Sequence, residues 1–171
     1  ILYLTSPVDE FALRALMKYD DKEFKSVSDD DLDLQTEEEK AAAKKKVEEN
    51  KDMLNFMKDA LNGEVKEVIL STKLKSHPVC LSTNGALSMG MEKVLNQMPN
   101  NGGEKVKAQR VLEINANHPV FQKLTALYKL DQNTLKKYTK LLYTQALLIE
   151  GVQIEDPVSF SNDICDLMVK A

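Results

Sequence analysis

Apolar residues at the start of the chain predict a strand, a helix and a second strand. Residues 1–4 form an apolar run that ends at a Thr-Ser-Pro sequence, which is typical of a short buried strand. Residues 11–17 have the apolar content of a helix that Ser6 and Pro7 would start, and residues 23–27 suit a second strand. A unit of about 28 residues is too small to hold a core alone, so we expect it to be the end of a preceding domain.

The middle of the chain predicts a long helix followed by a small sheet. Thr36 and the three glutamates after it form a capping box, and the helix should run to about Leu61, with Gly63 as its stop. Its first half is mostly Ala, Lys and Glu, so we expect that half to protrude. The apolar stripe that would pack consists of Val47, Leu54, Met57 and Leu61. The three strands of the sheet are expected at 65–74, 79–82 and 109–114.

The last third of the chain predicts three helices. Their starts are marked by His118–Pro119, by Thr134 as a cap and by Asp156–Pro157, and Gly151 should stop the second helix after about Glu150. Together with the sheet, these elements predict an α+β fold with a small three-stranded sheet, packed helices and a helical C-terminal part.

One segment of this helical part, residues 141–149, is apolar almost all round. A helix of this kind must be covered on most sides, and burying one leucine is worth about 1.5–3 kcal/mol. A second copy of the chain could supply the cover by closing a four-helix bundle on a two-fold axis. The alternative is that this helix is the central one of a monomeric core, and the pattern alone leaves both possibilities open.

A helix predicted at residues 85–98 carries a stripe rich in methionine. Gly85 and Gly90 weaken this helix by up to about 1 kcal/mol each relative to alanine. Flexible, polarisable methionines suit the binding of varied apolar partners, although a stripe at helical spacing is also typical of a core. The residues on the stripe are Leu87, Met91, Val94, Leu95 and Met98.

Composition narrows the possible partners and the chemistry. The 171 residues include 43% hydrophobic and 29% charged residues and have a net charge of −4, which fits a folded domain and gives no electrostatic reason to expect nucleic acid or an anionic membrane. No apolar run reaches the length of about 18 residues that spans a bilayer. The acidic stretch 28–33 is expected to be a solvated linker, because it lacks the glycine of a calcium loop. The Gly-rich stretch 100–103 lacks the lysine of a phosphate-binding loop.

The cysteines and histidines give weak support for catalysis. Cys80 and Cys165 are far apart in sequence and are expected to be buried thiols, although one bridge between them stays possible. His77 and His118 each precede a proline and lack neighbours at zinc-ligand spacing, so we expect a turn and a helix cap. A cysteine-dependent hydrolase built on Cys80 and His77 is the least favoured alternative, because residues three apart in a strand point to opposite faces. We predict no catalytic residue and no metal site.

Several ordered segments resemble the C-terminal domain of the ninety-kilodalton heat-shock chaperones in their bacterial form. The opening residues 2–11, with Pro-Val-Asp-Glu-Phe, are similar to the end of that family's middle domain. Residues 112–119, Leu-Glu-Ile-Asn-Ala-Asn-His-Pro, are close to a strand-to-helix junction of the family, and residues 141–151 with 155–157 resemble its dimerisation helix and the start of its last helix.

The resemblance implies a division into residues 1–33, the end of the middle domain with an acidic linker, and residues 34–171, a C-terminal dimerisation domain. It implies a cytoplasmic homodimer that contacts unfolded clients as part of an ATP-dependent chaperone. It also implies that this chain is not an enzyme and has no cofactor of its own, ATP and magnesium belonging to the intact protein. A passive dimeric scaffold without client binding is the alternative.

The predicted client-contact residues are those of the methionine-rich stripe. The predicted dimer interface consists of Tyr138, Leu141, Leu142, Gln145, Leu148, Ile149, Phe160, Ile164, Leu167 and Met168.

Overall fold

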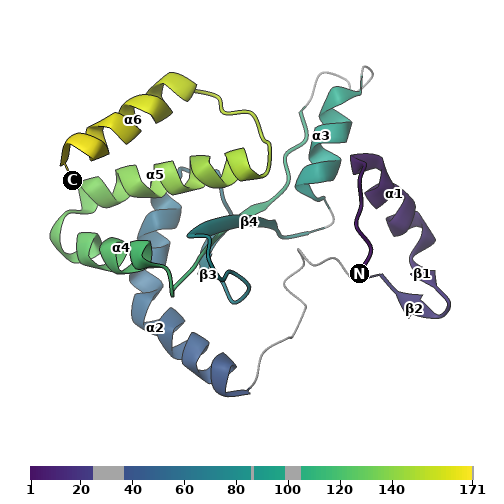
Figure 1. The fold of residues 1–171 in the computed structure, drawn as a ribbon, viewed down its shortest axis with the longest axis horizontal. Helices are drawn as coiled ribbons and strands as arrows, with labels where there is room; N and C mark the ends of the chain where they lie inside the picture. Colours follow the sequence, from purple (N-terminus) through teal and green to yellow (C-terminus); the bar gives the residue numbers. More distant parts are fainter. Residues whose placement is uncertain (25–36, 86, 99–104, 171) are drawn as a thin grey trace. The chain divides into compact units, whose positions relative to one another are not determined.

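The computed structural model describes residues 1–24, 37–85, 87–98 and 105–170 (Figure 1). Its contacts group the chain into two compact units. Unit 1 comprises residues 1–33 and 83–109, and unit 2 comprises residues 34–82 and 110–171. Each unit is described by itself.

Unit 1 begins with a helix and a very short hairpin. Helix α1 spans Pro7–Leu16 and starts at Ser6, whose backbone N–H donates to Asp9 in a capping box, as the Ser-Pro sequence predicts. Strands β1 (Lys18–Tyr19) and β2 (Lys22–Glu23) pair antiparallel across a two-residue turn. Asp20 and Asp21 form this turn with φ of 51° and 57°, the positive values that suit a tight hairpin.

The strand predicted at residues 1–4 is wrong. These residues are exposed and belong to no strand, because no other segment among the described residues pairs with them. The predicted strand at 23–27 is replaced by the shorter β2, and residues 25–27 lie outside the described part of the chain.

The methionine-rich helix of unit 1 is shorter than predicted. Helix α3 spans Met89–Gln97, and Ser88 is its N-cap, with Oγ accepting a hydrogen bond from the Met91 N–H. The prediction of a start at residue 85 is wrong, because Gly85 has a φ of +118°, which no right-handed helix contains.

Unit 2 is built around a long helix and a three-stranded sheet. Helix α2 spans Glu37–Ala60, and the chain leaves it through Gly63 at a φ of +85°, as predicted. Side chains 44–49 of α2 are exposed, as expected of a protruding part. The prediction that Val47 packs is wrong, because Val47 is 37% exposed. Thr36 lies outside the described residues. The end of α2 packs on the sheet and on the C-terminal helices through Met53, Leu54, Met57, Ala60 and Leu61.

The sheet has the strand order β3-β5-β4, with β3 at Glu67–Leu70, β4 at Val79–Thr83 and β5 at Arg110–Ile114. Strands β3 and β5 are parallel, with Glu67 opposite Val111 and Leu70 opposite Ile114. Strand β5 is central and every one of its residues is buried, so it is the middle of the core.

Three helices complete unit 2: α4 at Pro119–Leu130, α5 at Gln132–Ile149 and α6 at Pro157–Lys170. His118 Nδ1 accepts from the Val120 N–H, so His118 is the predicted cap. Asp131, and not Thr134, caps α5, because the helix begins three residues earlier than predicted and Asp131 Oδ1 accepts from the Thr134 N–H. Gly151 follows α5 with a φ of +64°, as predicted. The α+β fold is thereby confirmed, and the dimeric bundle stays a prediction. None of the described helices is long and apolar enough to span a bilayer.

Candidate interaction surfaces

The outer side of α5 and α6 carries the first candidate surface. Helix α5 packs against α2, α4 and α6 within unit 2 (Figure 1). Its inward face is fully used by Leu135, Thr139, Leu142, Tyr143, Ala146 and Leu147. The apolar side chains left exposed are Leu148 (47%), Ile149 (54%), Val158 (68%), Met168 (71%) and Val169 (88%), and we call these five the α5–α6 patch.

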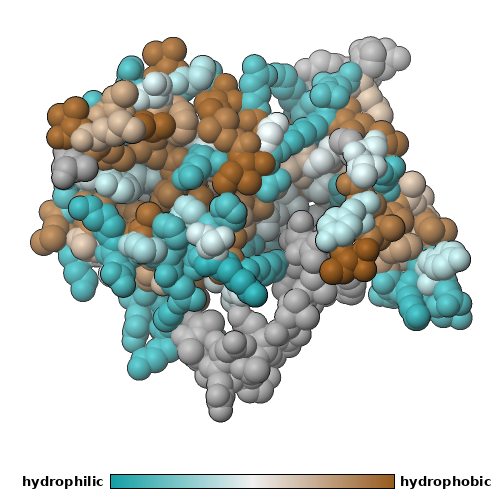
Figure 2. All heavy atoms as spheres, viewed as in Figure 1, coloured by the Kyte–Doolittle hydropathy of each residue, from teal (hydrophilic) through white to brown (hydrophobic). Residues whose placement is uncertain are grey.

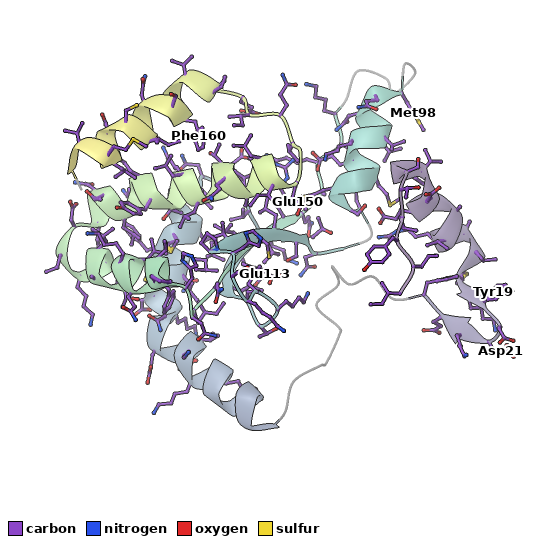
Figure 3. The ribbon with its side chains drawn as sticks, in the orientation of Figure 1. Tyr19, Asp21, Met98, Glu113, Glu150 and Phe160 are labelled. Atoms are coloured by element: carbon purple, nitrogen blue, oxygen red, sulfur yellow. The ribbon has the colours of Figure 1, made fainter. Side chains whose placement is uncertain are left out.

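The predicted interface residues fall into three groups. Leu148, Ile149, Met168 and the polar Gln145 are exposed, so a partner could reach them. Leu142 is only 7% exposed and belongs to the core of its own unit. The remaining predicted residues are partly exposed: Tyr138, Leu141, Phe160, Ile164 and Leu167. Figure 3 labels Phe160 on α6. Val158 and Val169 were not predicted, although their apolar side chains at the two ends of α6 could have indicated them.

Polar contacts fix α6 against α5. Lys137 Nζ of α5 lies 2.9 Å from Asp166 Oδ2 and 3.9 Å from Asp163 Oδ1 of α6. The hydrogen bond to Asp166, and the charges of both aspartates, raise the pKa of Lys137 above its ordinary value of 10.5. The pair is exposed, so it contributes little to the stability of the fold. Figure 2 shows hydrophobic side chains over the α6 region at the upper left.

Helix α3 carries the second candidate surface. Leu87, Met91, Val94 and Leu95 are partly exposed, and Met98 at the C-cap is exposed (Figure 3). Met89, which was not predicted, is the residue of α3 that is buried.

The polar side of α3 is tied to the segment that follows it. Asn96 exchanges two hydrogen bonds of 2.9 Å with the backbone of Val106, and Glu92 Oε2 accepts from the Ala108 N–H at 2.8 Å. These contacts hold the helix by its polar groups, while the methionine-rich stripe keeps part of its surface accessible.

A buried carboxylate lies beside one cysteine in the sheet of unit 2. Glu113 is 2% exposed and accepts a hydrogen bond from Ser71 Oγ at 2.7 Å. Burial, followed by the charge of Glu113, raises the pKa of the Cys80 thiol to about 12. Because the thiolate is the nucleophile, a thiol with this pKa is poorly suited to hydrolysis. Cys165 is exposed, contrary to the prediction of two buried thiols, and both cysteines are free in the structure.

A second buried polar group links the sheet to α5. Arg110 Nη1 donates to Tyr143 Oη at 3.0 Å, and Tyr143 Oη donates to Glu64 Oε2 at 3.1 Å. Burial raises the pKa of Tyr143, partly offset by the Arg110 guanidinium. Such a chain of buried hydrogen bonds fixes α5 on the sheet.

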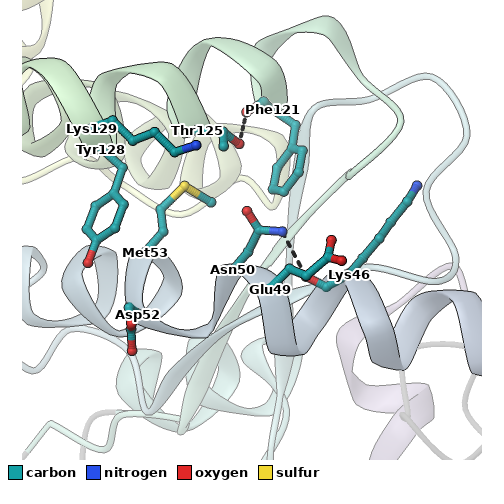
Figure 4. Close-up of a pocket in the computed structure, with 9 residues that line it drawn as sticks. All are labelled: Lys46, Glu49, Asn50, Asp52, Met53, Phe121, Thr125, Tyr128 and Lys129. Carbon is teal, nitrogen blue, oxygen red and sulfur yellow. Dashed lines mark hydrogen bonds between the residues drawn. The ribbon is translucent and has the colours of Figure 1, made fainter.

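A hollow of about 450 Å³ lies between α2 and α4 (Figure 4). Lys46 donates to Asn117 at 3.1 Å, and Asn50 donates to the Lys46 carbonyl, so these polar groups are already engaged. The residues that line the hollow are Lys46, Glu49, Asn50, Asp52, Met53, Phe121, Thr125, Tyr128 and Lys129. Because lysines and carboxylates both line the hollow, its charges favour neither an anionic nor a cationic ligand.

Comparison with known proteins identifies the family. A model described as Hsp90 protein matches residues 1–171. The chain is 57% identical over 168 residues to the chaperone protein HtpG of Clostridium acetobutylicum and 54% identical to that of Clostridium botulinum strain Langeland, each match covering 98% of this chain and 26% of the relative. HtpG of Shouchella clausii is 53% identical over 99% of the chain and 27% of its own length.

The fold and these matches define a chain of the heat-shock chaperone class. It belongs to the Hsp90 family, and its relatives are bacterial proteins named chaperone protein HtpG. The chain spans about a quarter of the length of these relatives.

The comparisons correct two predictions: that the chain is not an enzyme, and that it has no ATP or magnesium as cofactor. The chain belongs to the Hsp90 family over its whole length and matches about a quarter of each HtpG relative, and these findings do not uphold either prediction. The sequence therefore gives no ground for excluding nucleotide chemistry from this chain.

Among the described residues there is no group of three or more His, Cys, Asp or Glu side chains that could hold a metal ion. The hollow between α2 and α4 has the carboxylates of Glu49 and Asp52 and the ammonium groups of Lys46 and Lys129 on its wall, so its charges do not favour a phosphate. The stretches 28–33 and 100–103, for which a solvated linker and the lack of a phosphate loop were predicted, lie outside the described residues.

Proposed function

We propose that this chain is the homodimerisation and client-contact part of an ATP-dependent, cytoplasmic chaperone, and that it corresponds to the C-terminal domain of the Hsp90 family. Family membership supports the chaperone class. The α5–α6 patch is the observation that carries the dimer, because five apolar side chains on one pair of helices remain uncovered within unit 2.

The physical reason for a second copy is the cost of leaving this patch in water. Burying one side chain of this size fully is worth about 1.5–3 kcal/mol. The five side chains are 47–88% exposed, so each would gain a part of that amount when covered. A two-fold interface uses the same patch on both copies, so α5 and α6 of one chain would pack on α5 and α6 of the other.

Charged substitutions in the patch test the dimer. Leu148→Glu combined with Met168→Glu should convert a dimer to a monomer in sedimentation velocity, because four carboxylates would be brought into one apolar interface. Val47→Glu is the matched control, since Val47 is an exposed apolar residue of α2 in the same unit, and it should leave the mass unchanged. A dimer that survives the double substitution would contradict the proposed interface.

Client contact is proposed for the partly exposed stripe of α3. A passive scaffold is the competing function, and serine substitutions separate the two. Met91→Ser with Leu95→Ser should weaken binding of a permanently unfolded protein, such as reduced and carboxymethylated lactalbumin, while the dimer persists. Equal binding before and after the substitutions would favour the scaffold.

A further inference from the structure

Helices α1 and α3 of unit 1 are joined by a hydrogen bond between side chains that are 78 residues apart. Ser88 Oγ donates to Glu10 Oε2 at 2.5 Å, and the same Oγ accepts from the Met91 N–H at 3.1 Å. One hydroxyl therefore caps α3 and ties it to α1. The negative charge of Glu10 also lies beside the N-terminus of α3, where the helix dipole favours an anion.

Gly90 makes room for this contact. A Cβ at position 90 would lie 3.3 Å from Glu10 Oε2 and 3.7 Å from Ser88 Oγ, which is tighter than ordinary packing at the carboxylate. The sequence alone shows Gly90 only as a residue that weakens the helix. The structure gives a reason for it, because the glycine lets a carboxylate from another helix reach the cap.

Arg14 orients the carboxylate of Glu10. Its Nε and Nη2 donate to Glu10 Oε1 at 3.2 and 3.1 Å, one turn along α1. The two oxygens of Glu10 thus have different partners: Oε1 accepts from Arg14 of the same helix, and Oε2 accepts from Ser88.

Near its C-terminus α3 is held by Asn96, which exchanges two hydrogen bonds with the backbone of Val106, and Glu92 in its first turn accepts from the Ala108 N–H. Both ends of this short helix are therefore held through polar groups. The apolar stripe between them is not used for these contacts.

We propose that Arg14, Glu10 and Ser88 form a latch of positioning residues that holds α3 in the orientation in which its stripe contacts clients, so that the position of α1 controls the client surface. The claim that these residues control the client surface rests on the proposed client contact of α3. The claim that they hold α3 in place can be tested separately.

The most direct test exchanges donor and acceptor in the hydrogen bond between positions 88 and 10. Ser88→Asp keeps a side chain that can cap α3, because Asp is as good an N-cap as Ser, but it sets a carboxylate against Glu10. Adding Glu10→Gln restores the bond in the opposite direction: the Gln carbonyl oxygen still accepts from Arg14, and its amide N–H donates to the new aspartate. Ser88→Thr keeps the hydroxyl and is the conservative control.

Two measurements on the 171-residue chain report the result. Amide hydrogen exchange of α3 should become about tenfold faster in Ser88→Asp and return to the original rate in the double variant and in Ser88→Thr. The apparent dissociation constant for reduced, carboxymethylated lactalbumin should rise about threefold or more in Ser88→Asp and recover in the double variant, because fewer molecules hold α3 in the binding orientation.

The outcomes separate the latch from the client role. Unchanged exchange in Ser88→Asp, or a failure of Glu10→Gln to rescue it, would overturn the latch. Rescued exchange with client binding equal in all variants would overturn control of the client surface. If Met91→Ser with Leu95→Ser also leaves binding unchanged, the client role itself fails, whatever the exchange rates show.

Discussion

Lys137 on α5 and Asp166 on α6 form an ion pair with 2.9 Å between Nζ and Oδ2. We expect this contact to help set how α6 lies on α5, and with it which apolar side chains of α6 face outward. Asp163 at 3.9 Å adds to the attraction. The proposed dimer surface thus depends on an exposed polar contact as well as on apolar packing.

Removing the lysine should loosen α6. We expect Lys137→Met to increase hydrogen exchange of α6 amides while α5 stays protected, because α5 keeps its buried face. Lys140→Met, one turn along the same helix and exposed, is the control and should change little. The pKa of Lys137 is raised above 10.5, so its contribution is present at lower pH and is lost only as the pH rises through the folded-state pKa. Exchange of α6 that is identical in the two variants would show that the ion pair does not position the helix.

The two cysteines should differ in reactivity. With a pKa of about 12, Cys80 holds roughly a thousandth of the thiolate that a thiol with a pKa of 9 would hold near neutral pH. We expect iodoacetamide at pH 8 to alkylate the exposed Cys165 first, as followed by mass spectrometry of peptides. Urea should abolish the difference. Equal rates in the folded chain would contradict the environment assigned to Cys80.

The same thiol makes stability depend on alkaline pH. The folded state raises the pKa of Cys80 above its ordinary value of 9.0, so the folded state binds this proton more tightly than the unfolded state. The stabilisation is complete below about pH 9 and is lost as the pH rises toward 12. Cys80→Ala should therefore reduce the fall of the urea midpoint between pH 8 and 10. An identical fall in both proteins would exclude this linkage.

Tyr143 joins α5 to Arg110 of the sheet and to Glu64 after α2. Tyr143→Phe removes both hydrogen bonds and is expected to lower the free energy of unfolding by about 1–3 kcal/mol, since buried polar partners are left with one contact fewer. Tyr138→Phe on the same helix, where the side chain is partly exposed, should cost much less. Urea denaturation gives both free-energy changes. Equal losses would show that the hydrogen bonds of Tyr143 to Arg110 and Glu64 do not stabilise the fold.

Local sequence signals predicted most of the helices, because particular residue types favour the first and last positions of a helix. Pro7, His118–Pro119 and Pro157 begin helices as expected, and Gly63 and Gly151 end them at positive φ. The cap of α5 was placed at Thr134 instead of Asp131 because both residue types suit the position, and only the backbone decides between them.

Non-local features could not be predicted in the same way. An isolated apolar run such as residues 1–4 carries no information about a partner strand, and without one it is no strand. The parallel pairing of β3 with β5 and the buried Glu113 depend on segments more than 40 residues apart. A helix that is apolar all round does not indicate which side packs inside its own chain, so Leu142 and Leu148 looked alike, although one is core and the other is exposed.

The same limit applies to the latch. Glu10, Ser88 and Gly90 come together only through the packing of α1 on α3, and no spacing in the sequence relates them. Only the weakness of a helix with a glycine in its first turn could have indicated that something approaches it there.

Sedimentation equilibrium of the unaltered chain over a dilution series tests the proposed dimer most directly. Between about 1 and 100 µM the mass should approach twice the 19.3 kDa of one chain at the upper end and fall on dilution, as mass action requires. A mass of 19.3 kDa at every concentration would mean that the α5–α6 patch does not bind a second copy.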